Sequence, residues 1–425
     1  MRNLWTRTTE SAATGKPDVP HTWIASPDAL EELIGELLDE PAYAIDTEFH
    51  RERTYYPHLA LVQIGWSGGL ALIDPFTVDI TSFVRLFDSD VVAVFHAADQ
   101  DLEVLDHLTA RTPRRIFDTQ VAAGFVGFST PSLSTLAERV LGVRLSKGDR
   151  LTDWTQRPLT DAQRNYAASD VLHLLELRDL LNEQLETSGR TSWLEEELAL
   201  VQSRSRGDGH AERAWWRLKD GRVLRGKDRL IAQQLCMWRE RRAQAEDKPV
   251  RFVLPDLAVL TIAQSRPETP EALGAMRGID GRYLKGGAGR EILSVVSEAR
   301  DLPSSVLQVP VPEDFDRKLR PALTLVSAWV AQLARDAKID STLLATRADL
   351  VSLLRGDTDA RLANGWRAEI VGSAVRSLVS GNAALAFGDA SSLVLEQRSG
   401  TAIGTGIALP TADWVLDSPS RSDDE

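Results

Sequence analysis

The segment from Ala42 to Phe49 places two carboxylates, Asp46 and Glu48, inside a run of apolar and β-prone residues. A proline precedes the run and a charged stretch follows it, so the pattern predicts a buried β-strand. Residues two apart on a strand share a face, so Ala44, Asp46 and Glu48 point the same way. Neighbouring carboxylates on a core strand repel each other and lose hydration, and a bound divalent metal ion would offset both costs.

Length and composition limit the class of protein. A chain of 425 residues is long enough for two to four domains with separate cores. It has no run of 18 apolar residues and no apolar segment near its start, which predicts neither a membrane span nor a signal peptide. The single cysteine, Cys236, excludes an internal disulfide framework and a cysteine-based zinc site. We therefore expect a cytoplasmic protein.

The chain changes character near Gly189. Residues 1–21 are expected to be a disordered lead-in, and residues 22–190 alternate strand and helix patterns, as in an α/β domain. Residues 191–210 read as a connecting helix and linker, followed by two helical segments at 211–302 and 313–383. From 388 to 425 small and polar residues prevail, which predicts a largely disordered tail.

Further candidate functional residues follow the predicted strand at 42–49. Asp101 lies at the start of a helix that follows a predicted strand, where we expect it to face inward while Asp99 caps the helix. Tyr166 and Asp170 are four residues apart in a helical pattern, so they lie on one face. A loop-like segment carries two cations that could meet phosphates, Lys147 and Arg150.

The order of these motifs resembles the ribonuclease D family of 3′–5′ exonucleases, in the tyrosine-bearing branch of the DEDD superfamily. The resemblance spans roughly residues 22–383 and includes several further motifs: Arg53-Thr-Tyr-Tyr-Pro57, Leu61-Val-Gln-Ile64, His96-Ala97, Phe117-Asp-Thr-Gln120, Asp153-Trp154 and Arg157-Pro-Leu159. The helical segments look like two helicase-and-ribonuclease-D C-terminal (HRDC) domains. The second is signalled by Lys338-Ile339, Leu343-Leu-Ala-x-Arg347 and Gly365-Trp-Arg-x-Glu369.

The resemblance implies a ribonuclease H-like mixed sheet flanked by helices, followed by two small all-α domains. It also implies a site for two divalent ions, Mg²⁺ or Mn²⁺, because carboxylate oxygens suit hard cations. Asp46 would bridge the ions, Glu48 and Asp170 would complete the water-activating site, and Asp101 would support the second ion. A phenol stays protonated at neutral pH, so Tyr166 would orient the attacking water. Substrate contacts are expected from Thr47, Phe49, His96, Lys147, Arg150 and Trp154.

The implied activity is stepwise hydrolysis of RNA from its 3′ end, with release of nucleoside 5′-monophosphates during transfer-RNA 3′ processing. A DNA exonuclease of the same fold and an inactive nucleic-acid-binding scaffold are the alternatives. The net charge of −13 argues against a nonspecific nucleic-acid binder, but residues 211–251 carry twelve Lys and Arg against six Asp and Glu. This segment is therefore the expected nucleic-acid surface. We expect a monomer that acts on single-stranded 3′ ends of RNA.

Overall fold

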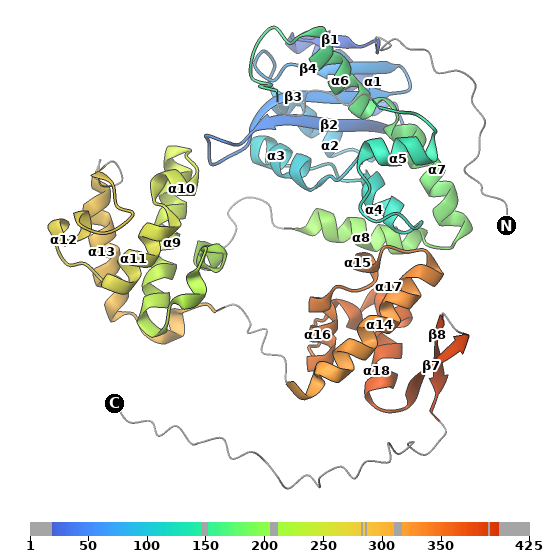
Figure 1. The fold of residues 1–425 in the computed structure, drawn as a ribbon. Helices are drawn as coiled ribbons and strands as arrows, with labels where there is room; N and C mark the ends of the chain where they lie inside the picture. The colour runs from blue at the N-terminus through green and yellow to red at the C-terminus, as the bar shows by residue number, and fades with distance from the viewer. Residues whose placement is uncertain are drawn as a thin grey trace.

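The computed structural model describes residues 19–145, 152–204, 211–281, 284, 287–309, 317–389 and 392–398. An α/β domain is followed by two groups of helices (Figure 1), which we call the first helical unit (211–309) and the second helical unit (317–398). Within the described residues, no helix is both long and apolar enough to span a membrane.

A six-stranded mixed sheet forms the centre of the α/β domain. Its spatial order is β1-β4-β3-β2-β5-β6, with strands β1 (Thr22–Ile24), β2 (Ala42–His50), β3 (His58–Trp66), β4 (Gly69–Ile73), β5 (Val92–Phe95) and β6 (Ile116–Asp118). The β2–β3 and β3–β4 pairs are antiparallel, and the β1–β4, β2–β5 and β5–β6 pairs are parallel. The predicted carboxylate-bearing strand is thus confirmed as β2, near the middle of a mixed sheet.

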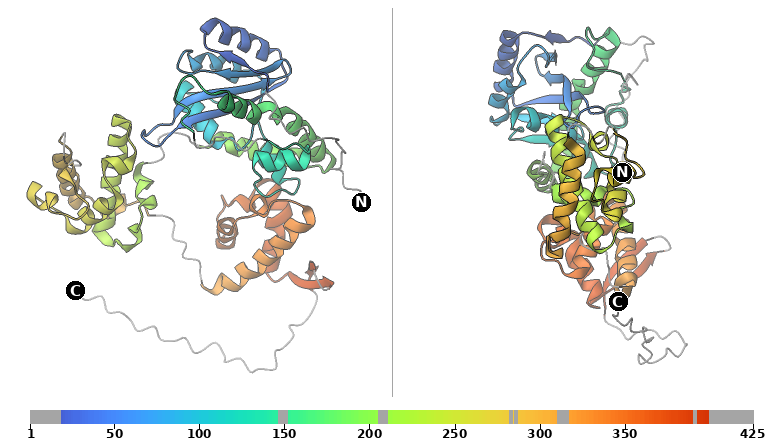
Figure 2. Two further views of the ribbon diagram at one scale, coloured as in Figure 1. Left: turned by 45° about the horizontal axis from the view of Figure 1, so that its top comes forward. Right: turned by 90° about the vertical axis from the view of Figure 1, so that its left-hand side faces the viewer.

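Helices cover both faces of this sheet (Figure 2, right). One face carries α1 (Pro27–Leu38), α2 (Val84–Phe87) and α3 (Asp99–Thr109), and the other carries α6 (Asp161–Leu172). The helices α4 (Thr119–Gly124), α5 (Leu133–Val140), α7 (Leu174–Thr187) and α8 (Thr191–Ser203) complete the domain towards the second helical unit. Because both faces are covered, the strands are almost continuously apolar, and residues such as Tyr43, Ile45 and Val62 are fully buried.

The first helical unit has an apolar core of its own. It contains short 3₁₀ turns at Ala211–Arg217 and Gly221–Val223 and the helices α9 (Gly226–Glu246), α10 (Val250–Val253), α11 (Asp256–Ser265), α12 (Pro270–Gly274) and α13 (Ala288–Asp301). Leu235, Cys236 and Ile292 lie in this core, and Cys236 is a buried free thiol, as a core position predicts.

The second helical unit shares its core with the α/β domain. Its elements are α14 (Arg320–Ala337), α15 (Ser341–Leu344), α16 (Arg347–Arg355), α17 (Gly365–Arg367), a π-helical turn (Ala368–Gly372), α18 (Ser373–Val379) and the strands β7 (Ala383–Asp389) and β8 (Ser392–Gln397). One apolar cluster runs from the sheet through α7 and α8 into α14 and α18.

The hairpin β7–β8 corrects one expectation. A disordered tail was predicted from residue 388, but Ser392–Gln397 pairs with Ala383–Asp389 in antiparallel register. The apolar residues Leu393, Val394 and Leu395 favour a strand. The prediction of disorder followed the small and polar residues that surround these three. Residues 399–425 lie outside the described part of the chain.

Candidate active site

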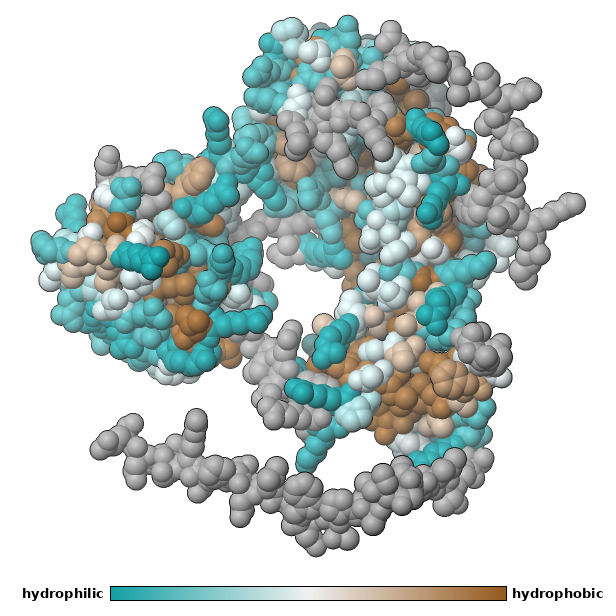
Figure 3. Space-filling view, viewed as in Figure 1, coloured by the Kyte–Doolittle hydropathy of each residue, from teal (hydrophilic) through white to brown (hydrophobic). Residues whose placement is uncertain are grey.

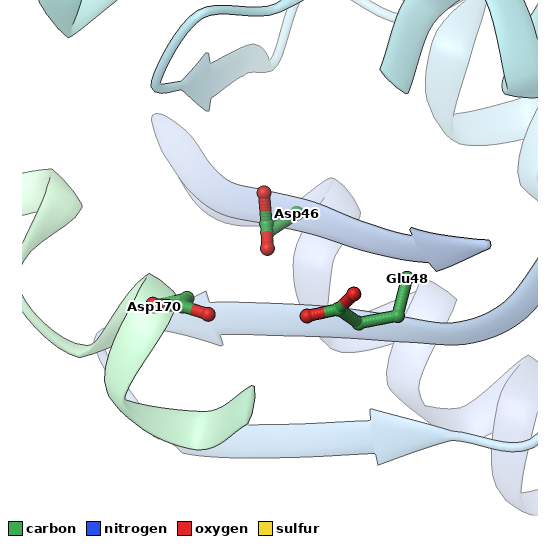
Figure 4. A group of neighbouring side chains, drawn as sticks. All are labelled: Asp46, Glu48 and Asp170. Carbon is green, nitrogen blue, oxygen red and sulfur yellow. The ribbon is translucent and has the colours of Figure 1, made fainter. Parts of the chain in front are cut away.

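Three carboxylates converge where strand β2 passes beneath helix α6. Asp46 and Glu48 come from β2 and Asp170 from α6, and one oxygen of each lies within 4.8 Å of the others. Figure 4 shows the three carboxyl groups turned towards one another. Alternation along the strand explains the first two, because Thr47 between them points to the opposite face. The regular β2–β3 register is interrupted between Glu48 and Phe49, so the ladder is irregular directly after this pair.

Helix α6 approaches the sheet closely enough to deliver Asp170. The helix starts at a capping box in which the Thr160 hydroxyl accepts from the Gln163 amide and the Gln163 side chain accepts from the Thr160 amide. Gly65 lies beneath the other end of the helix, where a Cβ atom would sit 3.2 Å from the Val171 carbonyl oxygen. A side chain at position 65 would push α6 away from β2, so the lack of one helps to bring Asp170 beside Asp46.

Asp101, in the first turn of α3, lies close enough for its charge to act on Asp46. It is 6% exposed, and its Oδ1 accepts hydrogen bonds from the Thr47 amide at 3.0 Å and the Thr47 hydroxyl at 2.6 Å. Asp101 was expected to point inward, and it does. Its carboxylate stands beside the group of three rather than within it, and Thr47 serves to hold Asp101 in place.

Asp99 does not cap α3 as expected. The N-cap residue is Ala98, without a side-chain cap, and Asp99 forms an ion pair with Arg204. Asp118, at the end of β6, accepts instead from the amides of Ala97 and Ala98 at 3.0 and 2.8 Å. The turn into α3 is therefore fixed by a neighbouring strand, which the local sequence does not reveal.

The crowding of these acids disturbs their protonation. Burial raises the pKa of Asp46 well above its ordinary value, and the nearby charges of Asp101, Asp170 and Glu48 raise it further. Burial also raises the pKa of Asp101 to about 7, against the lowering effect of its hydrogen bonds from Thr47. A divalent cation would relieve this repulsion, and a set of carboxylate oxygens fits Mg²⁺ or Mn²⁺. The residues present therefore fit a hard metal ion.

Tyr166 lies one turn before Asp170 on α6 and packs on Trp154, with ring centroids 6.1 Å apart. Trp154 was expected to contact substrate, but it is only 5% exposed and belongs to a small apolar cluster under Tyr166. Its burial makes it a support for Tyr166, and its contact with substrate stays a prediction.

The other predicted contact residues are dispersed. His96 lies apart from the three carboxylates: its Nε2 donates to the Pro131 carbonyl at 3.0 Å, and its Nδ1 lies 2.9 Å from the Thr119 hydroxyl. Burial lowers the pKa of His96, although the charge of Asp118 opposes this. Phe49 is half-buried, with the Arg51 guanidinium 5.9 Å from its ring centre. Lys147 and Arg150 fall outside the described residues.

Arg157 is a structural residue whose role the sequence did not reveal. Its guanidinium donates to both oxygens of Asp74 at 2.8 Å and to the carbonyls of Ala60 and Trp154 at 2.7 and 2.8 Å. Burial alone would raise the pKa of Asp74, but hydrogen bonds from Arg157 and the Phe76 amide lower it below its ordinary value. Arg157 thus ties the loop that precedes α6 to strands β3 and β4.

Comparison with known proteins places this geometry in a family. A 3′–5′ exonuclease family model matches residues 21–186, and an HRDC domain model matches residues 228–296. Ribonuclease D of Jannaschia sp. is 38% identical over 383 residues, covering 87% of this chain and 97% of its own. Ribonuclease D of Nitrobacter hamburgensis is 36% identical over 365 residues, covering 84% of this chain and 95% of its own.

The fold agrees. The crystal structure of Escherichia coli RNase D, described as an exoribonuclease involved in structured RNA processing, aligns with a TM-score of 0.76 and 31% identity. The alignment covers 85% of this chain and 99% of that one. The acidic site under α6 lies within the region that the exonuclease model matches. The chain belongs to the ribonuclease D family.

Proposed function

We propose that this chain is a metal-dependent exoribonuclease that removes nucleotides one at a time from RNA 3′ ends and releases nucleoside 5′-monophosphates. The observation that carries the proposal is the convergence of Asp46, Glu48 and Asp170, whose ligand atoms lie within 4.8 Å of one another. A group of half-buried acids has little structural value of its own, because each carboxylate raises the cost of ionising the next. A metal-dependent hydrolase needs such a group.

Each acid has a proposed role. Asp46, Glu48 and Asp170 would hold divalent ions, with Asp46 shared between two of them, and Asp101 would support the second ion. Two bound ions would supply an activated water and stabilise charge on the attacking and leaving oxygens. Thr47 fixes the Asp101 carboxylate through two hydrogen bonds, which leaves that group one preferred orientation.

Tyr166 is proposed to orient the attacking water through its hydroxyl group, which would place the chain in the tyrosine-bearing branch. Its support comes from two directions. Trp154 packs against its ring, and the Arg157–Asp74 pair fixes the loop from which α6 starts. A well-supported hydroxyl can hold a water in line with the scissile phosphate at little entropic cost.

The helical units are proposed to be two HRDC-like domains, at 211–302 and 313–383, joined to an exonuclease domain at 22–190 by the segment 191–210. Figure 3 shows an open space between the first and the second helical units. We propose that a single-stranded 3′ end passes through this space to the acids. The chain would act as a cytoplasmic monomer on transfer-RNA precursors.

The test is to incubate the protein with a 3′-extended transfer-RNA precursor and with matching single-stranded DNA, in Mg²⁺, in Mn²⁺ and in chelator. The proposal predicts stepwise shortening of the RNA from its 3′ end in either metal and none in chelator. Faster digestion of DNA would identify a DNA exonuclease instead. Binding without digestion under any metal would identify an inactive scaffold.

A further inference from the structure

A cavity of about 590 Å³ lies where the first helical unit meets the loop between β2 and β3. The loop contributes Arg51 and residues 54–57, and the helical unit contributes residues of α9, α10 and the preceding 3₁₀ turn. Arg51 follows Glu48 by three residues, so the cavity begins within about 11 Å of the catalytic strand's last acid at ~3.3–3.6 Å per residue. Figure 1 shows α10 close to the tip of this loop.

Several cations of the first helical unit are paired within the unit. Arg239 is 4% exposed and pairs with Asp256 at 2.7 Å, and Arg242 pairs with Glu291 at 2.9 Å. The Lys227 ammonium donates to the carbonyls of Arg300 and Leu302 at 2.8 and 2.5 Å. Part of the basic stretch singled out in the sequence is therefore an internal network, and only the other cations of the stretch can meet a ligand.

Two cations that line the cavity are exposed. The side chain of Arg217 is 75% exposed and forms a long ion pair with Glu240 at 3.7 Å. Arg251 is exposed and makes no ion pair with any described residue. The acids in the same walls are engaged: Glu103 pairs with Arg51 at 2.5 Å, and Glu240 accepts from the Tyr55 hydroxyl at 3.0 Å. The lining thus holds four arginines against three acids, and Arg251 is the one of these arginines that forms no ion pair with a described residue.

Aromatic rings accompany these cations. Phe252 follows Arg251 in the chain and lies outside the cavity lining; it is 51% exposed, with the Arg251 guanidinium 5.3 Å from its ring centre. Tyr55 and Tyr56 form part of the opposite wall, with rings in an edge-to-face contact at 4.9 Å. Exposed cations beside exposed aromatic faces are the combination that binds single-stranded nucleic acid, because phosphates meet the cations and bases stack on the rings.

We infer that this cavity and its rim bind the RNA strand on the 5′ side of the bond being cleaved, with Arg251 contacting a phosphate and Phe252, beside Arg251 at the rim, stacking on a base. The inference rests on the proposed exonuclease function and adds a second point at which the substrate is held. It assigns strand binding to one end of the first helical unit, the end that faces the β2–β3 loop.

The test measures the affinity of full-length protein for a single-stranded RNA of about twelve nucleotides, within the usual span of single-strand sites. Chelator is present, and the salt concentration is varied. Arg251→Ala should weaken binding and flatten the dependence of log affinity on log salt by about 0.7, the slope of one lost phosphate contact. Phe252→Ala should weaken binding about tenfold, by lost stacking, with the salt dependence unchanged. Arg290→Ala, an exposed cation on α13 away from the cavity, is the matched control and should change neither quantity.

Equal effects of Arg251→Ala and Arg290→Ala on the salt dependence would overturn the inference, as would a Phe252→Ala protein with wild-type affinity. The cleavage assay on the wild-type protein separates this result from the proposed function. If the wild-type protein shortens RNA while both cavity variants bind it normally, the exonuclease stands and the cavity has no part in it. If the wild-type protein does not shorten RNA at all, the proposed exonuclease function is wrong, whatever the cavity variants bind.

Discussion

The second helical unit shares an apolar core with the α/β domain, whereas the first has a core of its own. At the second unit, Trp366 stacks on Trp193 of α8 with ring centroids 4.9 Å apart. Glu197 of α8 pairs with Arg361 at 2.8 Å and with Arg367. The contacts of the first unit are polar instead: Asp247 accepts from the amides of Tyr55 and Tyr56 at 3.0 and 3.1 Å.

This difference indicates that the two helical units have different roles. Buried apolar contact stabilises a fold, so the second helical unit and the α/β domain together form the rigid framework that holds the acids in place. A few polar contacts at a half-exposed boundary contribute little to stability and can be exchanged for contacts with a ligand. The first unit is therefore suited to hold substrate, and damage to the two units should have different consequences.

The largest loss of activity is expected from a change among the carboxylates of the α/β domain. Asp46→Asn removes a carboxylate from the group of three and should lower the cleavage rate on the order of 10³-fold or more, as lost charge stabilisation in a catalytic site does. RNA affinity in chelator should stay near wild type, because the first unit is intact. Single-turnover cleavage and fluorescence anisotropy measure the two quantities. Near-normal cleavage by this variant would remove the acids from the mechanism.

The next largest effect is a loss of stability at the contact between the α/β domain and the second helical unit. Glu197→Gln leaves Arg367 buried at 3% exposure without its charge partner, which should cost about 3–5 kcal/mol of unfolding free energy. Urea denaturation measures this loss. A change below about 1 kcal/mol, typical of surface pairs, would mean that the second unit is attached as loosely as the first.

A smaller loss is expected when the support of α6 is weakened. Arg157→Lys cannot reproduce the paired hydrogen bonds to Asp74, so Asp170 and Tyr166 should shift. The cleavage rate should fall about 10–100-fold, and more Mg²⁺ should be needed for half-maximal rate. Arg144→Ala, at a surface ion pair with Glu138, is the control. A pure stability defect with unchanged metal dependence would contradict this positioning role.

The smallest effect is expected at the boundary of the first unit. Asp247→Ala removes the acceptor for two loop amides and should change the unfolding free energy by about 1 kcal/mol or less. Limited proteolysis should nevertheless cut faster between the first unit and the α/β domain. A loss as large as that of Glu197→Gln would mean that both units belong to one rigid body.

Much of the acidic site follows from local sequence. Strand alternation put Asp46 and Glu48 on one face, and helical spacing put Tyr166 and Asp170 together. Contacts between distant segments could not be predicted in the same way. Arg157 meets Asp74 across 83 positions, and Glu197 meets Arg367 across 170. Nothing near either residue marks its partner, since pairing depends on how the domains pack.

The same reason explains the errors. Asp99 has the sequence position of a helix cap, yet Asp118 from the neighbouring strand holds the turn. Trp154 was expected to contact substrate from its motif, and the fold buries it beneath Tyr166, which the local sequence did not reveal. Residue types at a given spacing indicated which chemistry is available, while tertiary packing decided which of these side chains are buried and which are exposed.

The central claim is that the carboxylates of β2 and α6 form a divalent metal site. The most direct measurement is Mn²⁺ binding to RNA-free protein by electron paramagnetic resonance, with wild type and Asp46→Asn titrated side by side. We predict saturable binding to the wild-type protein and its loss or strong weakening in the variant, with both proteins equally folded. Equal Mn²⁺ binding by the two proteins would contradict the claim and place the metal, and with it the chemistry, elsewhere in the chain.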